Sequence, residues 1–170
     1  EWRRALDLFA AMSEVLAEPS TITCNAAISA CAKGAEWQRA IDLLSAMGGA
    51  ILMPTISTYN SIISACEKGA VWQGALALLA AMGRTALEPD DISFNSVMSA
   101  CKEAGEWQAA LVVFTSMDEF GFEPDYISYS SAIGACNTGA EWQRGLELLV
   151  AMGQTFLDKV RFERIVANTC

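Results

Sequence analysis

Apolar and polar positions along this chain follow a helical period, and the whole pattern recurs every 35 residues. Within residues 21–55, the stretch T-I-T-C-N-A-A-I-S-A-C-A-K places its apolar side chains on one helical stripe. The stretch E-W-Q-R-A-I-D-L-L-S-A-M then forms a second stripe at i, i+3 and i+4 steps. Gly34 lies between them at the place of a helix stop, where a positive φ costs glycine little, and Gly69 and Gly139 repeat it, with Gly105 one place later. The pattern predicts a pair of antiparallel helices in each unit.

Three residue types mark the same 35-residue step independently. They are the tryptophans Trp2, Trp37, Trp72, Trp107 and Trp142, the methionines Met12, Met47, Met82, Met117 and Met152, and the prolines Pro19, Pro54, Pro89 and Pro124. Units of this length bury their apolar faces against their neighbours. We therefore expect an all-α fold, a right-handed superhelical α-solenoid of antiparallel helix pairs, with tryptophans packed between helices and small residues in the first helices allowing close approach.

The period also predicts where each unit begins and ends. The second helix of a partial repeat occupies residues 1–20, four repeats occupy 21–55, 56–90, 91–125 and 126–160, and a terminal or truncated helix occupies 161–170. The proline before each new unit cannot continue a helix. Asp90 and Asp125 follow two of these prolines and are predicted to cap the next first helix.

Composition removes several classes of function. The chain contains no histidine, which excludes the usual neutral-pH general base and most zinc sites. Cys31, Cys66, Cys101 and Cys136 repeat at the 35-residue step inside apolar stretches, so we expect buried structural thiols in a reducing compartment. We expect no enzyme, no metal site and no cofactor.

Charge and hydropathy bear on the partners. The net charge of -9 opposes binding to nucleic-acid phosphates. No apolar run reaches the roughly 18 residues of a membrane-spanning helix, so direct membrane insertion is not expected. The chain begins at Glu1, in the middle of a unit and without a visible targeting segment, which favours a fragment or a processed product.

The segments P-D-D-I-S-F-N-S-V-M-S-A-C and P-D-Y-I-S-Y-S-S-A-I-G-A-C resemble the pentatricopeptide repeat, in its P-type form of 35 residues. The nearest rival, the tetratricopeptide repeat, has a period of about 34 residues and lacks this Pro-Asp opening. The resemblance implies an organellar protein, of chloroplast or mitochondrion, that binds single-stranded RNA rather than DNA, with one base read per repeat.

The resemblance also assigns residues to roles. Each base would be read by the residue after the aromatic of the first helix together with the residue that ends the unit: Asn25 with Thr55, Asn60 with Asp90, Asn95 with Asp125, and Ser130 with Val160. The middle two pairs look like the family's uracil-reading combination, the first pair is ambiguous, and Val160 offers no hydrogen bond. Bases would be sandwiched by Ile22, Ile92 and Ile127, in a row that Ser57 interrupts, and phosphates would contact Lys33 and Lys68.

A second class of function stays open. The acidic charge and the imperfect reading pairs favour a protein-binding or architectural solenoid, such as a peripheral subunit of an organellar ribosome, photosystem or respiratory complex. The partner is therefore either pyrimidine-rich single-stranded RNA or the protein subunits of a larger assembly.

Overall fold

The computed structural model describes residues 3, 4, 6, 7, 9, 11, 20–85 and 87–169, with side chains as far as residue 157. Within these residues the secondary structure is entirely helical, as predicted. The helices are α2 (Thr21–Lys33), α3 (Trp37–Gly49), α4 (Ile56–Lys68), α5 (Trp72–Arg84), α6 (Asp91–Ala104), α7 (Trp107–Glu119), α8 (Tyr126–Thr138) and α9 (Trp142–Thr169). Trp2, Met12, Pro19 and Cys170 lie outside the described residues.

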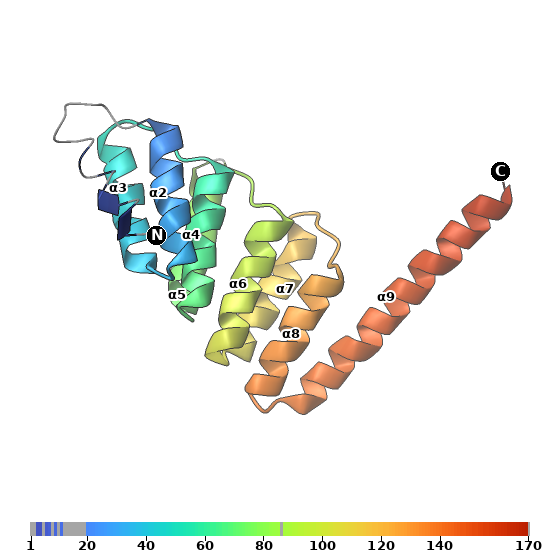
Figure 1. Ribbon diagram of the computed structural model, residues 1–170. Helices are drawn as coiled ribbons and strands as arrows, with labels where there is room; N and C mark the ends of the chain where they lie inside the picture. Colours follow the sequence, from blue (N-terminus) through green and yellow to red (C-terminus); the bar gives the residue numbers. More distant parts are fainter. Residues whose placement is uncertain are drawn as a thin grey trace.

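The helices form two rows that wind into a right-handed α-solenoid (Figure 1). The first helices α2, α4, α6 and α8 contact one another in sequence, while α3, α5 and α7 each contact their own first helix and the next one. Among the described residues, no second helix packs against another second helix. The inner row is therefore the tighter one, and its free side is the concave wall of the array. Ala65, Ala100 and Ala135 are fully buried in this row, which fits the prediction that small residues bring the first helices together.

Each first helix begins with the same reciprocal cap. The N-cap side chain accepts a hydrogen bond from the backbone N–H three residues later, and the hydroxyl of that later residue accepts from the N-cap N–H; the pairs are Ser20 with Thr23, Thr55 with Thr58, Asp90 with Ser93, and Asp125 with Ser128. Two backbone donors that a helix start leaves unpaired are thereby satisfied. The capping roles predicted for Asp90 and Asp125 are confirmed.

The structure corrects the prediction of which residue has a left-handed backbone at the end of each first helix. Gly34, Gly69 and Gly139 have φ of -89°, -87° and -80°, and the left-handed residue is the next one along: Ala35, Ala70 and Ala140, with φ of 57°, 52° and 60°. Gly105, with φ of 75°, occupies this same left-handed position in the third unit. All four glycines are the C-cap residues of their helices, so the predicted helix stops are confirmed, while the predicted positive φ is right for Gly105 and wrong for the other three.

Close packing explains why a glycine precedes the left-handed residue. A Cβ added to Gly69 would lie 2.9 Å from Cδ1 of Trp37, the tryptophan of the preceding unit. At Gly139 an added Cβ would overlap the ring of Trp107 in the same way. The tryptophans are thus contacts between units, and the glycine makes room for them. Trp142 has no such partner among the described residues and is 63% exposed.

The core follows the sequence ladders. Met47, Met82 and Met117 are buried, and the thiols predicted to be structural are free and fully buried, namely Cys31, Cys66, Cys101 and Cys136. Phe94 packs against Phe120 and Phe122, with ring centroids 5.5 and 5.6 Å away. Stacking therefore produces one continuous core along the axis of the array.

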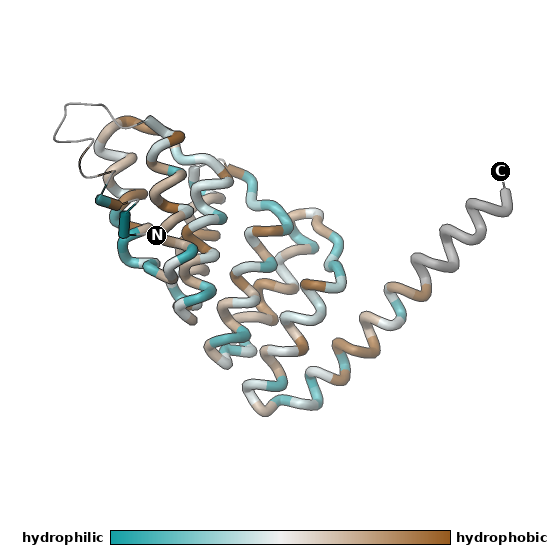
Figure 2. The backbone as a smooth tube through the Cα atoms, in the orientation of Figure 1, coloured by the Kyte–Doolittle hydropathy of each residue, from teal (hydrophilic) through white to brown (hydrophobic). Residues whose placement is uncertain are grey.

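Helix α9 is longer than the other second helices. It runs without interruption from Trp142 to Thr169, across residue 160, where the sequence predicts the fourth unit to end. Its first part packs against α8, and Figure 2 shows hydrophobic residues along the coloured part of the helix. In the described part of the chain no helix combines the length and the apolarity needed to cross a bilayer.

Candidate nucleic-acid interface

The concave wall carries a groove of about 490 Å³ between neighbouring first helices. Its lining includes Asn60, Asp90 and Ile92, together with Ser57, Lys33 and Lys68. The sequence assigned Asn60 and Asp90 to base reading, Ile92 to base sandwiching and the two lysines to phosphate contact, and the fold brings them to one place beside Ser57, where the sandwiching row is interrupted. Such a groove is concave, partly apolar and supplied with a few polar groups, as ligand sites usually are.

Asn60 and Asp90 are joined directly in this groove. The amide nitrogen Nδ2 of Asn60 donates to Oδ1 and Oδ2 of Asp90, at 3.0 and 3.2 Å, and the amide oxygen Oδ1 accepts from the hydroxyl of Ser93 at 2.6 Å. A carboxylate accepts but does not donate, so the amide is held with its nitrogen toward Asp90. One N–H and one lone pair of the Asn60 amide then remain for a ligand.

Hydrogen bonding controls the charge of both reading carboxylates. Burial alone would raise the pKa of Asp90, but the backbone N–H of Ser93 and the side chains of Asn60 and Ser93 outweigh it, so the pKa lies below its ordinary value. The pKa of Asp125 is lowered in the same way, against burial, by the backbone and hydroxyl of Ser128 and the amide of Asn95. Both groups are therefore anions at neutral pH.

The other two asparagines are held mainly by hydroxyls. The amide oxygen of Asn95 accepts from Ser128 at 2.9 Å, and that of Asn25 accepts from Thr58 at 2.6 Å. Thr58 also exchanges a hydrogen bond with Thr55, at 3.0 Å, so Asn25 and Thr55 are linked through Thr58. The first unit thus lacks the carboxylate that orients Asn60.

The isoleucines of the predicted sandwich stand on the open surface. Ile22, Ile92 and Ile127 are 81%, 62% and 56% exposed. Ser57 is exposed at the interrupted place in the row. The surface therefore offers separate apolar contacts beside the polar reading groups.

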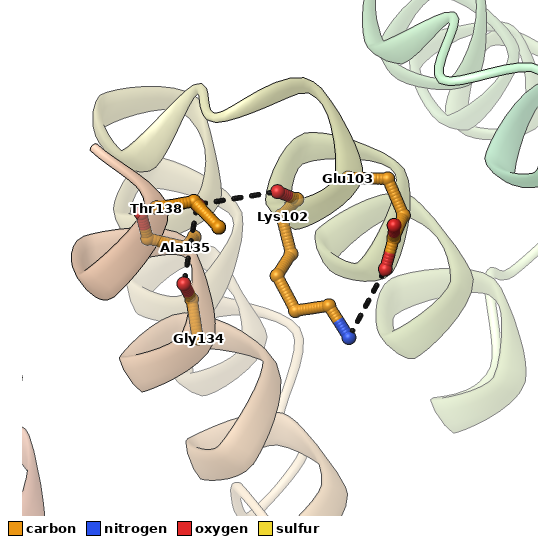
Figure 3. A network of polar contacts seen from close by, with 5 residues as sticks. All are labelled: Lys102, Glu103, Gly134, Ala135 and Thr138. Carbon is orange, nitrogen blue, oxygen red and sulfur yellow. Dashed lines mark hydrogen bonds and ion pairs between the residues drawn. The ribbon is translucent and has the colours of Figure 1, made fainter.

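The two predicted phosphate contacts differ in their surroundings. Lys33 is exposed at the end of α2, whereas Nζ of Lys68 donates to the carbonyl of Ala32 at 2.9 Å and so caps the preceding first helix. Thr138 makes the equivalent bond to the carbonyl of Lys102 at 3.3 Å, while the Lys102 ammonium pairs with Glu103 at 3.2 Å (Figure 3). Of the two lysines that line the groove, Lys33 is therefore the one whose ammonium is more available to a phosphate.

Two protein-family models match most of the chain. The family model described as PPR repeat family matches residues 54–102 and 89–138, and the one described as pentatricopeptide repeat domain matches residues 8–68. The chain belongs to the pentatricopeptide repeat family. No curated protein sequence matches the chain as a relative.

Solved structures of pentatricopeptide repeat proteins share this fold. The protein PPR10 from maize has a TM-score of 0.77 and 25% identity over 92% of this chain, and PPR10 in complex with an 18-nt psaJ RNA element has a TM-score of 0.73 and 22% identity over 88%. The pentatricopeptide domain of Arabidopsis thaliana protein-only RNase P 1, in complex with tRNA, has a TM-score of 0.77 and 14% identity over 91% of this chain and 82% of its own. The chain spans only 22% of the length of PPR10.

The fourth pentatricopeptide repeat presents a different surface. Ser130 is exposed and lines a second groove of about 540 Å³, between α8 and α9, with apolar side chains that include Trp142, Leu146 and Leu149. The side chain of its proposed partner Val160 lies outside the described residues. This groove occupies the place where, in the earlier repeats, the next first helix packs.

Sequence reasoning missed the hydroxyls that bind the asparagines. Thr58, Ser93 and Ser128 belong to a ladder that starts at Thr23 and repeats at the 35-residue step, three places after each N-cap. The capping-box pattern would have located them, but their bonds to the preceding repeat depend on how the helices stack. Among the described residues, no group of His, Cys, Asp or Glu is arranged to hold a metal ion.

Proposed function

We propose that this chain binds single-stranded RNA along its concave wall, one base to a repeat, with a preference for uracil at the two middle repeats. The observation that carries the proposal is the groove in which Asn60, held by Asp90, lies beside the exposed Ile92 and the cation of Lys33. A nucleotide has a polar base edge, an apolar base face and a negative phosphate, and the amide, the isoleucine and the lysine of the groove are suited to bind them in that order.

The reading pairs differ in what they support. Asn60 with Asp90 and Asn95 with Asp125 combine an amide with a carboxylate anion, and we assign uracil to both. Asn25 with Thr55 combines an amide with hydroxyls, and we assign it a pyrimidine with lower selectivity. Ser130 is assigned no strong preference. The organelle, chloroplast or mitochondrion, and the absence of DNA binding are proposed from the family.

Similar proteins support the proposal without deciding it. PPR10 and the pentatricopeptide domain of protein-only RNase P 1 are known in complexes with an RNA element and with tRNA. Both share the stacking of helix pairs described above. The side-chain chemistry of the groove, rather than the shared fold, supports the base preferences.

The test compares RNAs of equal length, one uracil-rich and one purine-rich, at several salt concentrations by fluorescence anisotropy. We expect tighter binding to the uracil-rich RNA. The double variant Asn60→Thr and Asn95→Thr should lose that preference and keep its helical content, while Gln108→Thr, an exposed change on α7, should keep both. No complex with either RNA at low salt would refute the proposal.

One observation favours a second function, that of a protein-binding scaffold. The groove between α8 and α9 is apolar, and Leu146, Val150 and Leu157 are 51%, 60% and 71% exposed. Contiguous apolar surface of this kind often marks a protein interface. Copurification of the native chain with a protein complex after nuclease treatment would support this function, and a free monomer would count against it.

A further inference from the structure

We propose that Thr58, Ser93 and Ser128 are positioning residues, each of which fixes the reading asparagine of the repeat before it. This inference rests on the proposed function and adds a third residue to each reading pair. The reading unit for one base would then be an asparagine from one first helix together with the N-cap and the hydroxyl three places later in the next.

The geometry repeats in three consecutive repeats. The hydroxyl oxygen lies 2.6 Å from Oδ1 of Asn25, 2.6 Å from Oδ1 of Asn60 and 2.9 Å from Oδ1 of Asn95. Thr58, Ser93 and Ser128 are all fully buried, so water does not compete for these bonds. The same residues close the capping boxes of α4, α6 and α8, which fixes their own position.

The bond matters because an asparagine amide can rotate by half a turn and exchange donor for acceptor. With the oxygen bound by a hydroxyl, the amide keeps its N–H groups for the carboxylate and for the ligand. A base that offers an acceptor is then favoured over one that offers a donor at the same place. A rotated amide would reverse this preference.

The three repeats depend on the hydroxyl to different degrees. Asn60 is also held by two contacts to the carboxylate of Asp90, so removal of Ser93 leaves it partly oriented. Asn95 is held chiefly by the bond from Ser128, because its amide makes only the weakest of the contacts that lower the pKa of Asp125, and Asn25 is held by the bond from Thr58. We therefore expect Ser128→Ala to change base selectivity more than Ser93→Ala.

Thr23 provides a matched control. It forms the same capping box with Ser20 at the start of α2, and within the described residues its side chain bonds Ser20 and no asparagine. Thr23→Ala therefore removes one cap hydroxyl without touching a reading residue. The conservative variant Ser128→Thr is the rescue, because Thr58 occupies the equivalent buried position with the same bonds.

The experiment measures selectivity and side-chain order together. RNAs with a randomised central triplet are selected on wild type and on each variant, and ¹⁵N relaxation of the Asn95 side-chain amide is recorded without RNA. Ser128→Ala removes the bond to Asn95 together with the bond of 2.8 Å to Oδ1 of Asp125, so it should reduce the preference for uracil at one triplet position by about five- to tenfold and lower the order of the Asn95 amide. Ser128→Thr should restore both, and Thr23→Ala should change neither.

The outcomes separate the two claims. RNA binding by wild type, with unchanged selectivity in Ser128→Ala, would overturn the positioning role and leave the proposed function standing. An equal loss of selectivity in Thr23→Ala would also overturn it, because the effect would then come from helix capping. A wild-type chain that binds no RNA would refute the proposed function and the reading role with it, and the relaxation data would then show whether Ser128 orders Asn95.

Discussion

The turn between α4 and α5 allows a direct test of which residue carries the left-handed backbone. Ala70 has φ of 52°, whereas Gly69 before it has φ of -87° and lies against Trp37. A left-handed conformation costs a residue with a Cβ about 1–2 kcal/mol. Ala70→Gly removes that cost, and the greater freedom of glycine in the unfolded chain takes back about 0.4–1 kcal/mol. We expect Ala70→Gly to raise the free energy of unfolding by about 0.5–1 kcal/mol.

The opposite result is expected one residue earlier. In Gly69→Ala the new Cβ would lie 2.9 Å from Cδ1 of Trp37, and overpacking of this kind costs about 1–3 kcal/mol. The reduced freedom of the unfolded chain returns about 0.4–1 kcal/mol. The free energy of unfolding should therefore fall by about 0.5–2 kcal/mol. Gly83→Ala is the control, because an added Cβ there meets nothing within 4 Å and should stabilise α5 by about 0.5–1 kcal/mol.

Urea denaturation followed by far-UV circular dichroism measures all three variants. For a chain of this length, 1 kcal/mol corresponds to about 2–4 °C in melting temperature, so a thermal scan provides a second reading. A less stable Ala70→Gly, together with a Gly69→Ala as stable as Gly83→Ala, would refute the reasoning. Such results would mean that Ala70 carries no left-handed strain and that Gly69 has room for a Cβ beside Trp37.

Three further predictions follow from charge and burial. Folding lowers the pKa of Asp90 and of Asp125 below the ordinary value of 3.8, so the stability that each carboxylate contributes is present above its unfolded pKa and is lost as the pH falls through the folded pKa. In a double variant with both residues changed to Asn, the urea midpoint should therefore fall less on acidification than in the wild type. Burial raises the pKa of Cys66 and Cys101 to about 11, so iodoacetamide at neutral pH should modify neither in the folded chain and both in urea, as mass spectrometry would show. Lys33→Ala should reduce the slope of log affinity against log salt for RNA by about 0.7, while Lys68→Ala should change the slope less and lower stability by about 1 kcal/mol, because Lys68 caps α2.

The sequence predicted those features that depend on period and on local chemistry. Helix pairs, the buried cysteine ladder and the caps at Asp90 and Asp125 follow from the order of residue types along one unit. The left-handed position did not follow, because a glycine can serve either a turn or a close contact, and only the position of Trp37 against Gly69 distinguishes them. How neighbouring units stack decides which role a glycine has, and the sequence of a single unit does not show that stacking.

The same limit applies to the candidate site. Asn60 and Asp90 were paired in advance by a family resemblance, but the bond from Ser93 to Asn60 joins residues 33 positions apart and depends on the lateral offset between α4 and α6. The engagement of Lys68 by the carbonyl of Ala32 likewise depends on how α4 lies against α2. A residue assigned to a ligand from sequence can thus be occupied by its own neighbouring repeat.

The distribution of charge bears on how the groove would hold RNA. The chain has a net charge of -9, and one of the two lysines lining the groove is bound to a backbone carbonyl. Phosphate contacts, which are indifferent to sequence, can therefore supply only a small part of the affinity. Under the proposed function, the remainder would come from the amides, which distinguish bases, and from the exposed isoleucines, which contact any base face. The amides would then supply the selective contacts, so a misoriented asparagine would lower the selectivity of the array directly. The buried hydroxyls that hold Asn25, Asn60 and Asn95 are consistent with that requirement.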